Sequence, residues 1–133
     1  MCKSSIEMVC LGSHLFADVK LWDRTANSFA NTLLTFDTGA SVTTISKDIL
    51  CDLGYDINCG NIQKISTASG IEYVREVIID KIRIGDFELE NVNVYAHAFP
   101  EESFSIGVIG LNVLSLFDIN LKFSKKLIEL EKI

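Results

Sequence analysis

The stretch LLTFDTGASVTTIS, residues 33–46, ends an apolar run in a carboxylate and continues at once with small and β-branched residues. The run before Asp37 is typical of a buried strand. Asp, Thr and Gly are also common in turns. The segment therefore leaves two interpretations open. Either Asp37 opens a turn, or it is a catalytic carboxylate anchored by the strand before it.

The composition sets limits on the fold and on the partners. The chain has 133 residues, 48% of them apolar, which is enough for one core, so we predict a single domain over residues 1–133. A net charge of −6 with no basic stripe disfavours nucleic acid. No apolar run approaches the ~20 residues of a membrane-spanning helix, so no membrane partner is expected. Residues 1–16 make a poor signal peptide, and we expect a cytoplasmic location.

Short apolar runs separated by turn signals predict an all-β barrel or sandwich. The strands are predicted at residues 15–22, 29–36, 81–84, 87–96 and 127–130, with two more within 61–80 and an alternating run at 119–123. A helix capped by Ser46 is expected to stop at Gly54, and a second short helix is expected at 111–117. The apolar phase slips between Leu89 and Val92, which predicts a β-bulge.

Metal, nucleophile and phosphate sites are disfavoured by spacing. The four cysteines form no C-x-x-C pair, and adding His14 or His97 gives no usual zinc spacing, so reduced and mostly buried thiols are expected. Neither histidine accompanies a Ser or Cys nucleophile motif. No glycine-rich phosphate loop occurs. We therefore predict no metal and no cofactor.

A second motif strengthens the catalytic interpretation of Asp37. Val108-Ile109-Gly110 is an apolar-apolar-Gly sequence, and the predicted short helix follows it. The chain thus contains, in order, a hairpin, FDTGAS (36–41), a hairpin with a glycine at its tip, VIGLNVLSLF (108–117) and a closing hairpin. This order resembles the retropepsin-like aspartic proteases, the single-domain relatives of pepsin that include the retroviral proteases. The resemblance covers residues 15 to 131, and residues 109–130 are particularly similar to cellular and bacterial members.

The resemblance implies an all-β fold: a closed or partly open acid-protease-type barrel of short strands, with a hairpin flap and one or two short helices. It also implies an aspartic endopeptidase acting on protein or peptide substrates. Such enzymes need two carboxylates that share one proton. This chain has one Asp-Thr-Gly and about half the length of a two-lobed enzyme. A homodimer would supply the pair, because its two-fold axis would place Asp37 beside its own copy.

By the same resemblance, the neighbours of Asp37 would support the active-site loop. Thr38 would hydrogen-bond across the axis, and Gly39 would let the backbone approach the carboxylate and donate an N–H. Gly110 would provide the cramped space beneath the loop. Ala40 lacks the hydroxyl that a Ser or Thr would offer to an ionised carboxylate. We therefore expect activity closer to neutral pH than in a relative that carries the hydroxyl.

Two further segments acquire expected functions. The tip formed by Ala68, Ser69 and Gly70 is a candidate substrate-binding flap, since glycine allows the turn and small side chains let the backbone bind an extended peptide. An ordinary hairpin turn is an equal alternative. The strand at 127–130 is expected to be a closing edge that pairs with its copy in the dimer.

Two alternatives to the endopeptidase remain at this point. One is a retropepsin-like dimerisation or peptide-binding module with little or no proteolytic activity. The other is an unrelated β-barrel binder in which Asp37 opens a turn. An intact Asp-Thr-Gly favours catalysis, because a binding module does not need two carboxylates that repel each other.

Overall fold

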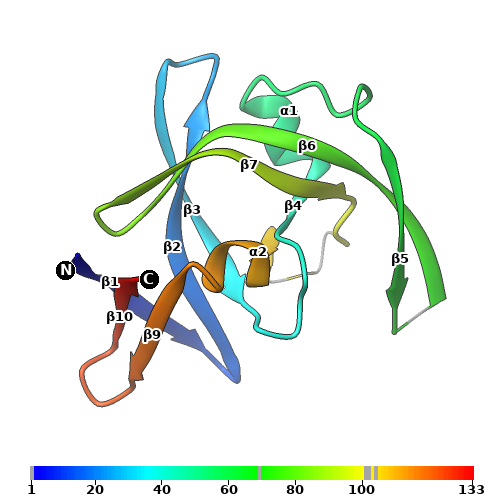
Figure 1. The fold of residues 1–133 in the computed structure, drawn as a ribbon. Coiled ribbons are helices and arrows are strands. Elements are labelled where there is room, and N and C mark those ends of the chain that lie inside the picture. The colour runs from blue at the N-terminus through cyan, green and yellow to red at the C-terminus, as the bar shows by residue number, and fades with distance from the viewer. Residues whose placement is uncertain (1, 69, 101–102, 104) are drawn as a thin grey trace.

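A computed structural model describes all residues except 1, 69, 101–102 and 104, and Figure 1 shows the fold. In the described ranges the chain forms ten strands and two short helices, which confirms the predicted all-β class. The elements are β1 (Lys3–Leu11), β2 (His14–Asp23), β3 (Ser28–Phe36), β4 (Thr44–Ser46), α1 (Lys47–Asp52), β5 (Ile62–Thr67), β6 (Gly70–Ile84), β7 (Phe87–His97), β8 (Gly107–Ile109), α2 (Leu111–Leu114), β9 (Phe117–Lys122) and β10 (Leu127–Lys132). Within these ranges neither helix is long and apolar enough to cross a membrane.

The strands form one strongly curved sheet. Their order is β5-β6-β7-β4-β8-β3-β2-β1-β10-β9, with β5 and β9 at the ends. β6 also pairs with β2, through Lys20↔Arg83 and Leu21↔Ile82. This extra pairing closes part of the sheet into a ring around the core, as Figure 1 shows. The arrangement agrees with the predicted closed or partly open barrel.

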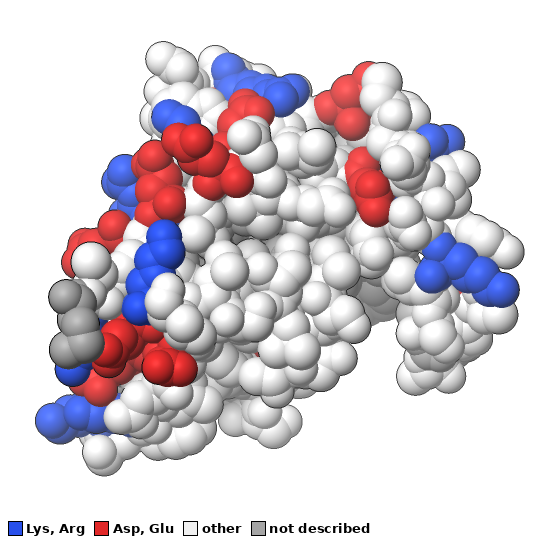
Figure 2. Space-filling model, in the orientation of Figure 1, with Lys and Arg blue, Asp and Glu red and all other residues white. Residues whose placement is uncertain are grey.

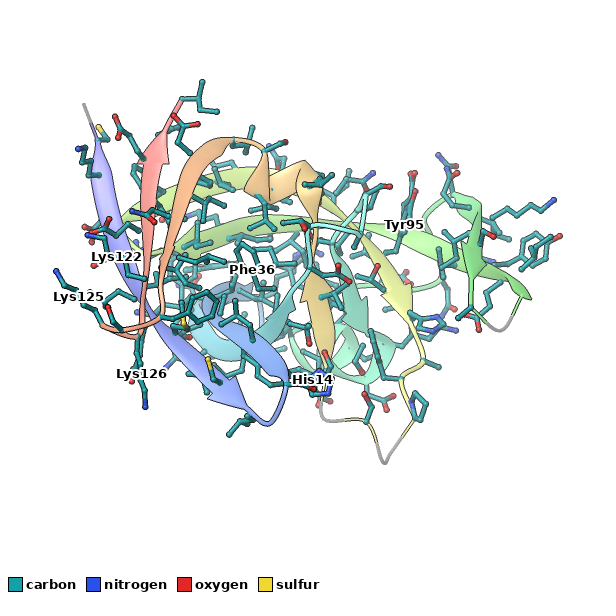
Figure 3. All side chains as sticks on the ribbon, turned by 90° about the horizontal axis from the view of Figure 1, so that it is seen from below. His14, Phe36, Tyr95, Lys122, Lys125 and Lys126 are labelled. Atoms are coloured by element: carbon teal, nitrogen blue, oxygen red, sulfur yellow. The ribbon has the colours of Figure 1, made fainter. Side chains whose placement is uncertain are left out.

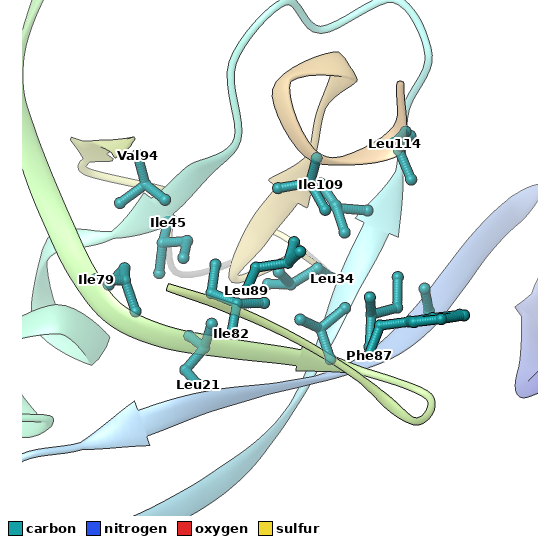
Figure 4. Close-up of a cluster of buried hydrophobic side chains, with 14 of the residues drawn as sticks. Leu21, Leu34, Ile45, Ile79, Ile82, Phe87, Leu89, Val94, Ile109 and Leu114 are labelled. Atoms are coloured by element: carbon teal, nitrogen blue, oxygen red, sulfur yellow. The ribbon is translucent and has the colours of Figure 1, made fainter. Parts of the chain in front are cut away.

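The core fills the inside of this ring because strand side chains alternate between its two faces. Leu21, Leu34, Ile45, Ile82 and Ile109 are fully or almost fully buried, and they come from five different strands. Figure 4 shows these side chains converging from the surrounding strands. Burying one such side chain stabilises the fold by about 1.5–3 kcal/mol. The core therefore fixes the ends of β3 and β8. The candidate site lies at these ends.

Strand β8 lies between two strands that are consecutive in the chain. It runs parallel to β3 through Phe36↔Ile109 and antiparallel to β4 through Thr44↔Val108. Residues 37–43, which join β3 to β4, must therefore pass over the end of β8, where α2 begins. We call this segment the Asp37 loop.

The β5–β6 hairpin extends from the ring on the side of the molecule away from β9 and β10 (Figure 1). β5 pairs with β6 from Ile62↔Arg75 to Thr67↔Gly70, and the last pair joining β6 to β7 is Arg75↔Ala96. We call β5 together with residues 70–74 of β6 the hairpin arm. The two strands around a glycine tip that the sequence predicted within 61–80 are confirmed. β6 is nevertheless one continuous strand that also includes the strand predicted separately at 81–84.

The N-terminal strand β1 was not predicted, and it changes the arrangement of the closing hairpin. Residues 3–7 of β1 pair with β10, and residues 8–11 pair with β2. Alternation on β1 buries Ile6 and Met8. β10 consequently lies between β1 and β9, so the expectation that residues 127–130 form an open edge is wrong. The open edge at this end of the sheet is β9.

The predicted bulge between Leu89 and Val92 is also wrong. The register is unchanged from Ile79↔Val92 to Ile82↔Leu89, so no residue is inserted on one strand alone. Instead, the alternation of inward-facing side chains shifts by one residue on both β6 and β7, at the same level of the sheet. Because both strands shift together, the register between them is unchanged. Asn91 adopts a left-handed backbone there, with φ 52°, a conformation that asparagine tolerates better than most residues.

The short helix α1 lies where it was expected, with Leu50 and Leu53 buried. Ser46 is the N-cap residue by position, but its side chain makes no capping hydrogen bond. Gly54 follows the helix with φ +89°, which favours glycine. The four cysteines form no disulfide but are all exposed, which corrects the expectation of buried thiols. Cys51, for example, follows the buried Leu50 and lies on the outer side of α1.

Candidate active site

Asp37 follows the last residue of β3 and is held by the backbone on both sides. Its N–H donates to the Ile109 carbonyl of β8 (3.2 Å), and its own carbonyl accepts from the N–H of Ala40 (3.3 Å). The carboxylate oxygen Oδ1 accepts from the N–H of Gly39 (2.9 Å). The residue is half-exposed. One bond thus orients a carboxylate that can still reach solvent or another molecule.

The first turn of α2 holds the Asp37 loop from below. The N–H of Leu111 donates to the Ala40 carbonyl (2.8 Å), and the N–H of Asn112 donates to the Ser41 carbonyl (3.1 Å). The first N–H groups of a helix have no partner within the helix. Here the loop supplies those acceptors, so α2 and the loop fix each other.

Gly110 lies directly beneath this loop. A Cβ added there would be 2.8 Å from the Ala40 carbonyl oxygen, 2.8 Å from the Val42 carbonyl carbon and 3.0 Å from the Thr43 nitrogen. Its backbone is extended, with φ −107° and ψ −174°. Lack of space, and not an unusual backbone conformation, therefore requires glycine at this position.

A polar network that was not predicted from the sequence starts at the buried Thr43 and links the loop to α2 and β7. The Thr43 hydroxyl accepts from the N–H of Gly110 (3.0 Å) and donates to Oδ1 of Asn112 (2.8 Å). The same Oδ1 accepts from the N–H of Thr43 (2.8 Å). Nδ2 of Asn112 donates to the Asn93 carbonyl (2.7 Å). The available signals were a threonine within an apolar β-branched run and an asparagine opening an apolar helix.

The other site residues expected from the sequence fall in two places. Thr38 and Gly39 are exposed at the turn of the Asp37 loop. Ala68 and Gly70 lie at the tip of the hairpin arm, where Gly70 has φ +125° and a Cβ would meet no atom within 4 Å. Ser69 lies outside the described residues. The tip stands apart from the Asp37 loop in both Figure 1 and Figure 3, so the single chain does not bring the two together.

Charge is distributed unevenly around the loop. Figure 2 shows acidic and basic groups most densely at the left of the view, with others along the top and the right edge, while the central area over α2 and the Asp37 loop is mostly uncharged. Figure 3 places Phe36, which precedes Asp37, in the middle of the molecule, and Lys122, Lys125 and Lys126 at the β9–β10 end. The exposed large apolar residues near the loop include Leu111 in α2 and Leu116 after it.

The two cavities found among the described residues lie elsewhere. The larger, about 670 Å³, is polar and lies beside β1, β9 and β10, with Asp118 and Glu129 in its lining. The smaller, about 370 Å³, lies near Tyr55 and Cys59. Neither is lined by the Asp37 loop or by the tip of the arm. In the described part of the chain no group of three or more His, Cys, Asp or Glu side chains could hold a metal ion.

Comparison with known proteins places this site in a family. A sequence model of aspartyl proteases matches residues 26–113, which include the Asp37 loop, β8 and most of α2. The chain therefore belongs to the aspartyl protease family, a class of hydrolases. The interpretation as an unrelated β-barrel binder is thus wrong. No protein with a curated description matches the sequence.

The comparison of structures narrows the fold. The chain is similar to a crystal structure of a retropepsin-like aspartic protease from Rickettsia conorii, with a TM-score of 0.70 and 20% sequence identity. The match covers 97% of this chain and 89% of that protein. At this identity the likeness shows the fold, which is retropepsin-like, as the order of motifs predicted.

Proposed function

We propose that this protein is an aspartic endopeptidase that works as a homodimer, with one Asp37 from each copy. The observation that carries this proposal is a half-exposed carboxylate on a loop bonded to β8 and α2, in a chain of the aspartyl protease family. A turn residue would not need that many restraints. A carboxylate that must keep its position relative to a second carboxylate does need them.

The chemistry uses the two carboxyl groups in different protonation states. Two carboxylates ~3 Å apart do not both ionise, so they share one proton. The ionised group takes a proton from water as the water oxygen bonds to the carbonyl carbon of the peptide. The other group donates its proton to the carbonyl oxygen. When the tetrahedral intermediate collapses, the C–N bond breaks and the nitrogen leaves with the proton that the first carboxyl group took from water. The second carboxylate takes back a proton from the hydroxyl group whose oxygen becomes the new carbonyl, so the pair again shares one proton.

Features of the surface support a second copy as the source of the other carboxylate. Thr38 and Gly39 are exposed at the turn, within reach of another chain. Leu111, whose N–H bonds to the Ala40 carbonyl of the loop, is 42% exposed, and Leu116, which follows α2, is 41% exposed. Ile133, 80% exposed, lies beside Leu116 and donates its N–H to the Leu116 carbonyl (3.2 Å). A neighbouring copy would remove these apolar groups from water.

At the end of the sheet that contains β10, the strand edge available for pairing with that copy is β9, because β10 lies between β1 and β9. Antiparallel pairing of two β9 edges about Asn120 would set Asp118 of one copy opposite Lys122 of the other. Opposite charges in facing positions favour such a pair. In the single chain Lys122 pairs with Glu129 (3.2 Å), a contact that this arrangement would extend.

The proposal is tested by cleavage of an unfolded protein, together with sedimentation to determine the assembly. We expect a dimer, and we expect Asp37→Asn to lower cleavage by at least about a hundredfold while the dimer persists. Asp52→Asn, an exposed change on α1, is the matched control and is expected to keep activity. A monomer that cleaves would contradict the proposal. A dimer that binds peptide without cleaving it would instead select the peptide-binding module.

A mixing experiment tests whether each copy supplies one carboxylate. Wild-type protein is equilibrated with a large excess of Asp37→Asn, so that most wild-type chains are in mixed dimers. If one Asp37 per copy is required, activity per wild-type chain falls steeply. An excess of Asp52→Asn, which keeps Asp37, is expected to cause no such loss. Unchanged activity per wild-type chain in the first mixture would show that one copy suffices.

A further inference from the structure

The hairpin arm has fewer backbone hydrogen bonds to the ring than the part of β6 that continues from it. From Arg75 to Ile84, β6 pairs with β7, and Arg75 also pairs with Ile62 of β5. Residues 70–74 of β6 pair with β5 alone. Side-chain contacts from this segment back to the ring therefore have a large influence on where the arm lies.

One ion pair among the described residues makes such a contact. Oε2 of Glu72 in the arm lies 3.2 Å from Nε2 of His97, the last residue of β7. Continued one step beyond the last pair, Arg75↔Ala96, the register would set Val74 opposite His97 and Glu72 diagonal to it on the same face. The imidazole also makes an edge contact with Phe99 at 5.3 Å between ring centroids. His97 is therefore held in place, and the arm closes onto it.

The surroundings of the carboxylate make this contact sensitive to protonation. Oε2 of Glu72 is buried and accepts no hydrogen bond from the described residues, although the side chain as a whole is 36% exposed. A buried carboxylate oxygen is costly unless a cation or a donor faces it. His97 supplies a cation only when both of its ring nitrogens carry a proton.

We propose that Glu72 and His97 form an acid-stabilised latch that holds the hairpin arm against the end of β7. With His97 protonated, the buried oxygen faces a positive charge and the arm stays closed. When the proton is lost, the oxygen gains by moving into water, and the arm opens.

The other charged groups around His97 are consistent with this assignment. On the same face of β6, Glu76 accepts from Nε2 of Gln63 (2.9 Å). Arg75 projects from the other face, and its Nη1 donates to the Gly60 carbonyl (3.0 Å). On the β4 side, the residue paired with His97 is the uncharged Ser46. Glu101 and Glu102, which follow β7, lie outside the described residues and are tested separately below.

Under the proposed function, which this step assumes, the latch regulates access to the active site. The arm tip with Ala68 and Gly70 would cover a bound peptide, and a latched arm would be ordered before the substrate arrives. Less ordering would then be needed on binding. Glu72 and His97 are thus positioning residues, which act on the substrate through the arm. The expected result is tighter substrate binding in mildly acid solution.

The latch can be tested without any cleavage. Backbone amide exchange of residues 66–73 is measured by NMR at pH 5.5 and pH 7.5 and expressed as protection relative to an unstructured chain. We expect protection in the wild type to be about threefold greater at pH 5.5, the effect of a partly exposed ion pair. Glu72→Gln and His97→Gln are expected to show equal, low protection at both values. His97→Lys, with a permanent cation, is expected to stay protected at pH 7.5.

Controls separate the latch from general effects of charge. Glu88→Gln removes a carboxylate from another ion pair between β6 and β7. Its partner is Arg83 (3.1 Å), and arginine is a permanent cation in proteins. That variant and the double change of Glu101 and Glu102 to Gln are expected to behave as wild type. A pH dependence that survives Glu72→Gln would overturn the proposal, as would equal protection of the wild-type arm at the two values.

A second readout connects the latch to activity. The ratio of KM for Glu72→Gln to KM for the wild type is expected to be larger at pH 5.5 than at pH 7.5. Since both proteins carry Asp37, titration of the active site cancels from this ratio. An unchanged ratio together with a confirmed exchange result would mean that the latch exists but the arm does not cover the substrate. Loss of cleavage in every sample would challenge the proposed function and leave the exchange result intact.

Discussion

The Asp37 loop and the hairpin arm show opposite ways of presenting residues at a surface. Backbone bonds to Ile109 of β8 and from Leu111 and Asn112 of α2 hold the loop. The end of the arm pairs with a single neighbouring strand, and its tip is open around Gly70. Hydrolysis by paired carboxylates requires a fixed carboxylate and a removable cover. Under the proposed function, the loop would fix the carboxylate and the arm would cover the substrate, and the two segments differ in how many partners hold each of them.

A similar contrast holds along β6 itself. In the ring, Asp80 accepts two hydrogen bonds from Arg24, at 2.8 and 2.9 Å. These bonds lower the pKa of Asp80 below its ordinary value. In the arm, Glu72 faces His97, which is a cation only when protonated. In the ring, the carboxylate faces an arginine, which is a permanent cation. In the arm, which we propose opens, the carboxylate faces a histidine, which can lose its charge.

The largest effect is expected when Gly110 and Gly70 are each changed to Ala. At Gly110 the added Cβ would meet three backbone atoms within 3.0 Å, so Gly110→Ala is expected to lower the free energy of unfolding by about 3 kcal/mol. At Gly70 the Cβ has open space, but φ is +125°, so Gly70→Ala is expected to cost about 1 kcal/mol. Urea unfolding at one protein concentration measures both.

This pair of variants can break the comparison outright. If Gly70→Ala costs as much as Gly110→Ala, the arm is held as firmly as the loop. Amide exchange sharpens the result. The effect of Gly70→Ala is expected to be confined to the arm, whereas that of Gly110→Ala is expected to include α2 and the Asp37 loop.

A smaller effect is expected from Thr43→Val, which keeps the side-chain shape but removes the hydroxyl. The buried N–H of Gly110 would lose its acceptor, and Asn112 would lose one of its donors. An unsatisfied buried N–H costs about 1–3 kcal/mol, so a loss of about 2 kcal/mol in unfolding free energy is expected.

The neighbouring residue provides the control for this change. The Thr44 hydroxyl makes a longer bond, to the Val42 carbonyl at 3.3 Å, in a half-buried position. Thr44→Val is therefore expected to cost less than Thr43→Val in the same urea titration. Equal losses would mean that the network beneath the loop adds no special stability.

Some features were predictable because local sequence determines them. The hairpin at residues 81–96 follows from alternation around Gly85-Asp86, and Gly85 has φ +60°. The position of Asp37 at the end of β3 follows from the apolar run before it. The retropepsin-like fold followed from several such short motifs in a fixed order.

Other features depend on partners distant in the sequence, and for that reason they were missed. Thr43 and Asn112 are 69 positions apart, so no local pattern connects them. The order of β1, β10 and β9 depends on which strands meet after folding, which is why the open edge was assigned to the wrong strand. The pairing of Glu72 with His97 needs the register of β6 on β7. In each case the sequence showed the residue but not the residue that it contacts.

The smallest effect tests the permanent ion pair on β6. Because the pKa of Asp80 is lowered in the folded state by hydrogen bonds from Arg24, its contribution to stability is present above about pH 4 and is lost as the pH falls through the lower folded value. Asp80→Asn is therefore expected to reduce unfolding free energy at pH 6 by less than about 1 kcal/mol, since both side chains are partly exposed, and the deficit is expected to shrink toward pH 2. Urea titrations of both proteins across this range measure the difference. The same variant should leave arm exchange between pH 5.5 and 7.5 unchanged. If it abolished that dependence, β6 would respond as one unit, and the separation between its fixed and switchable ends would be lost.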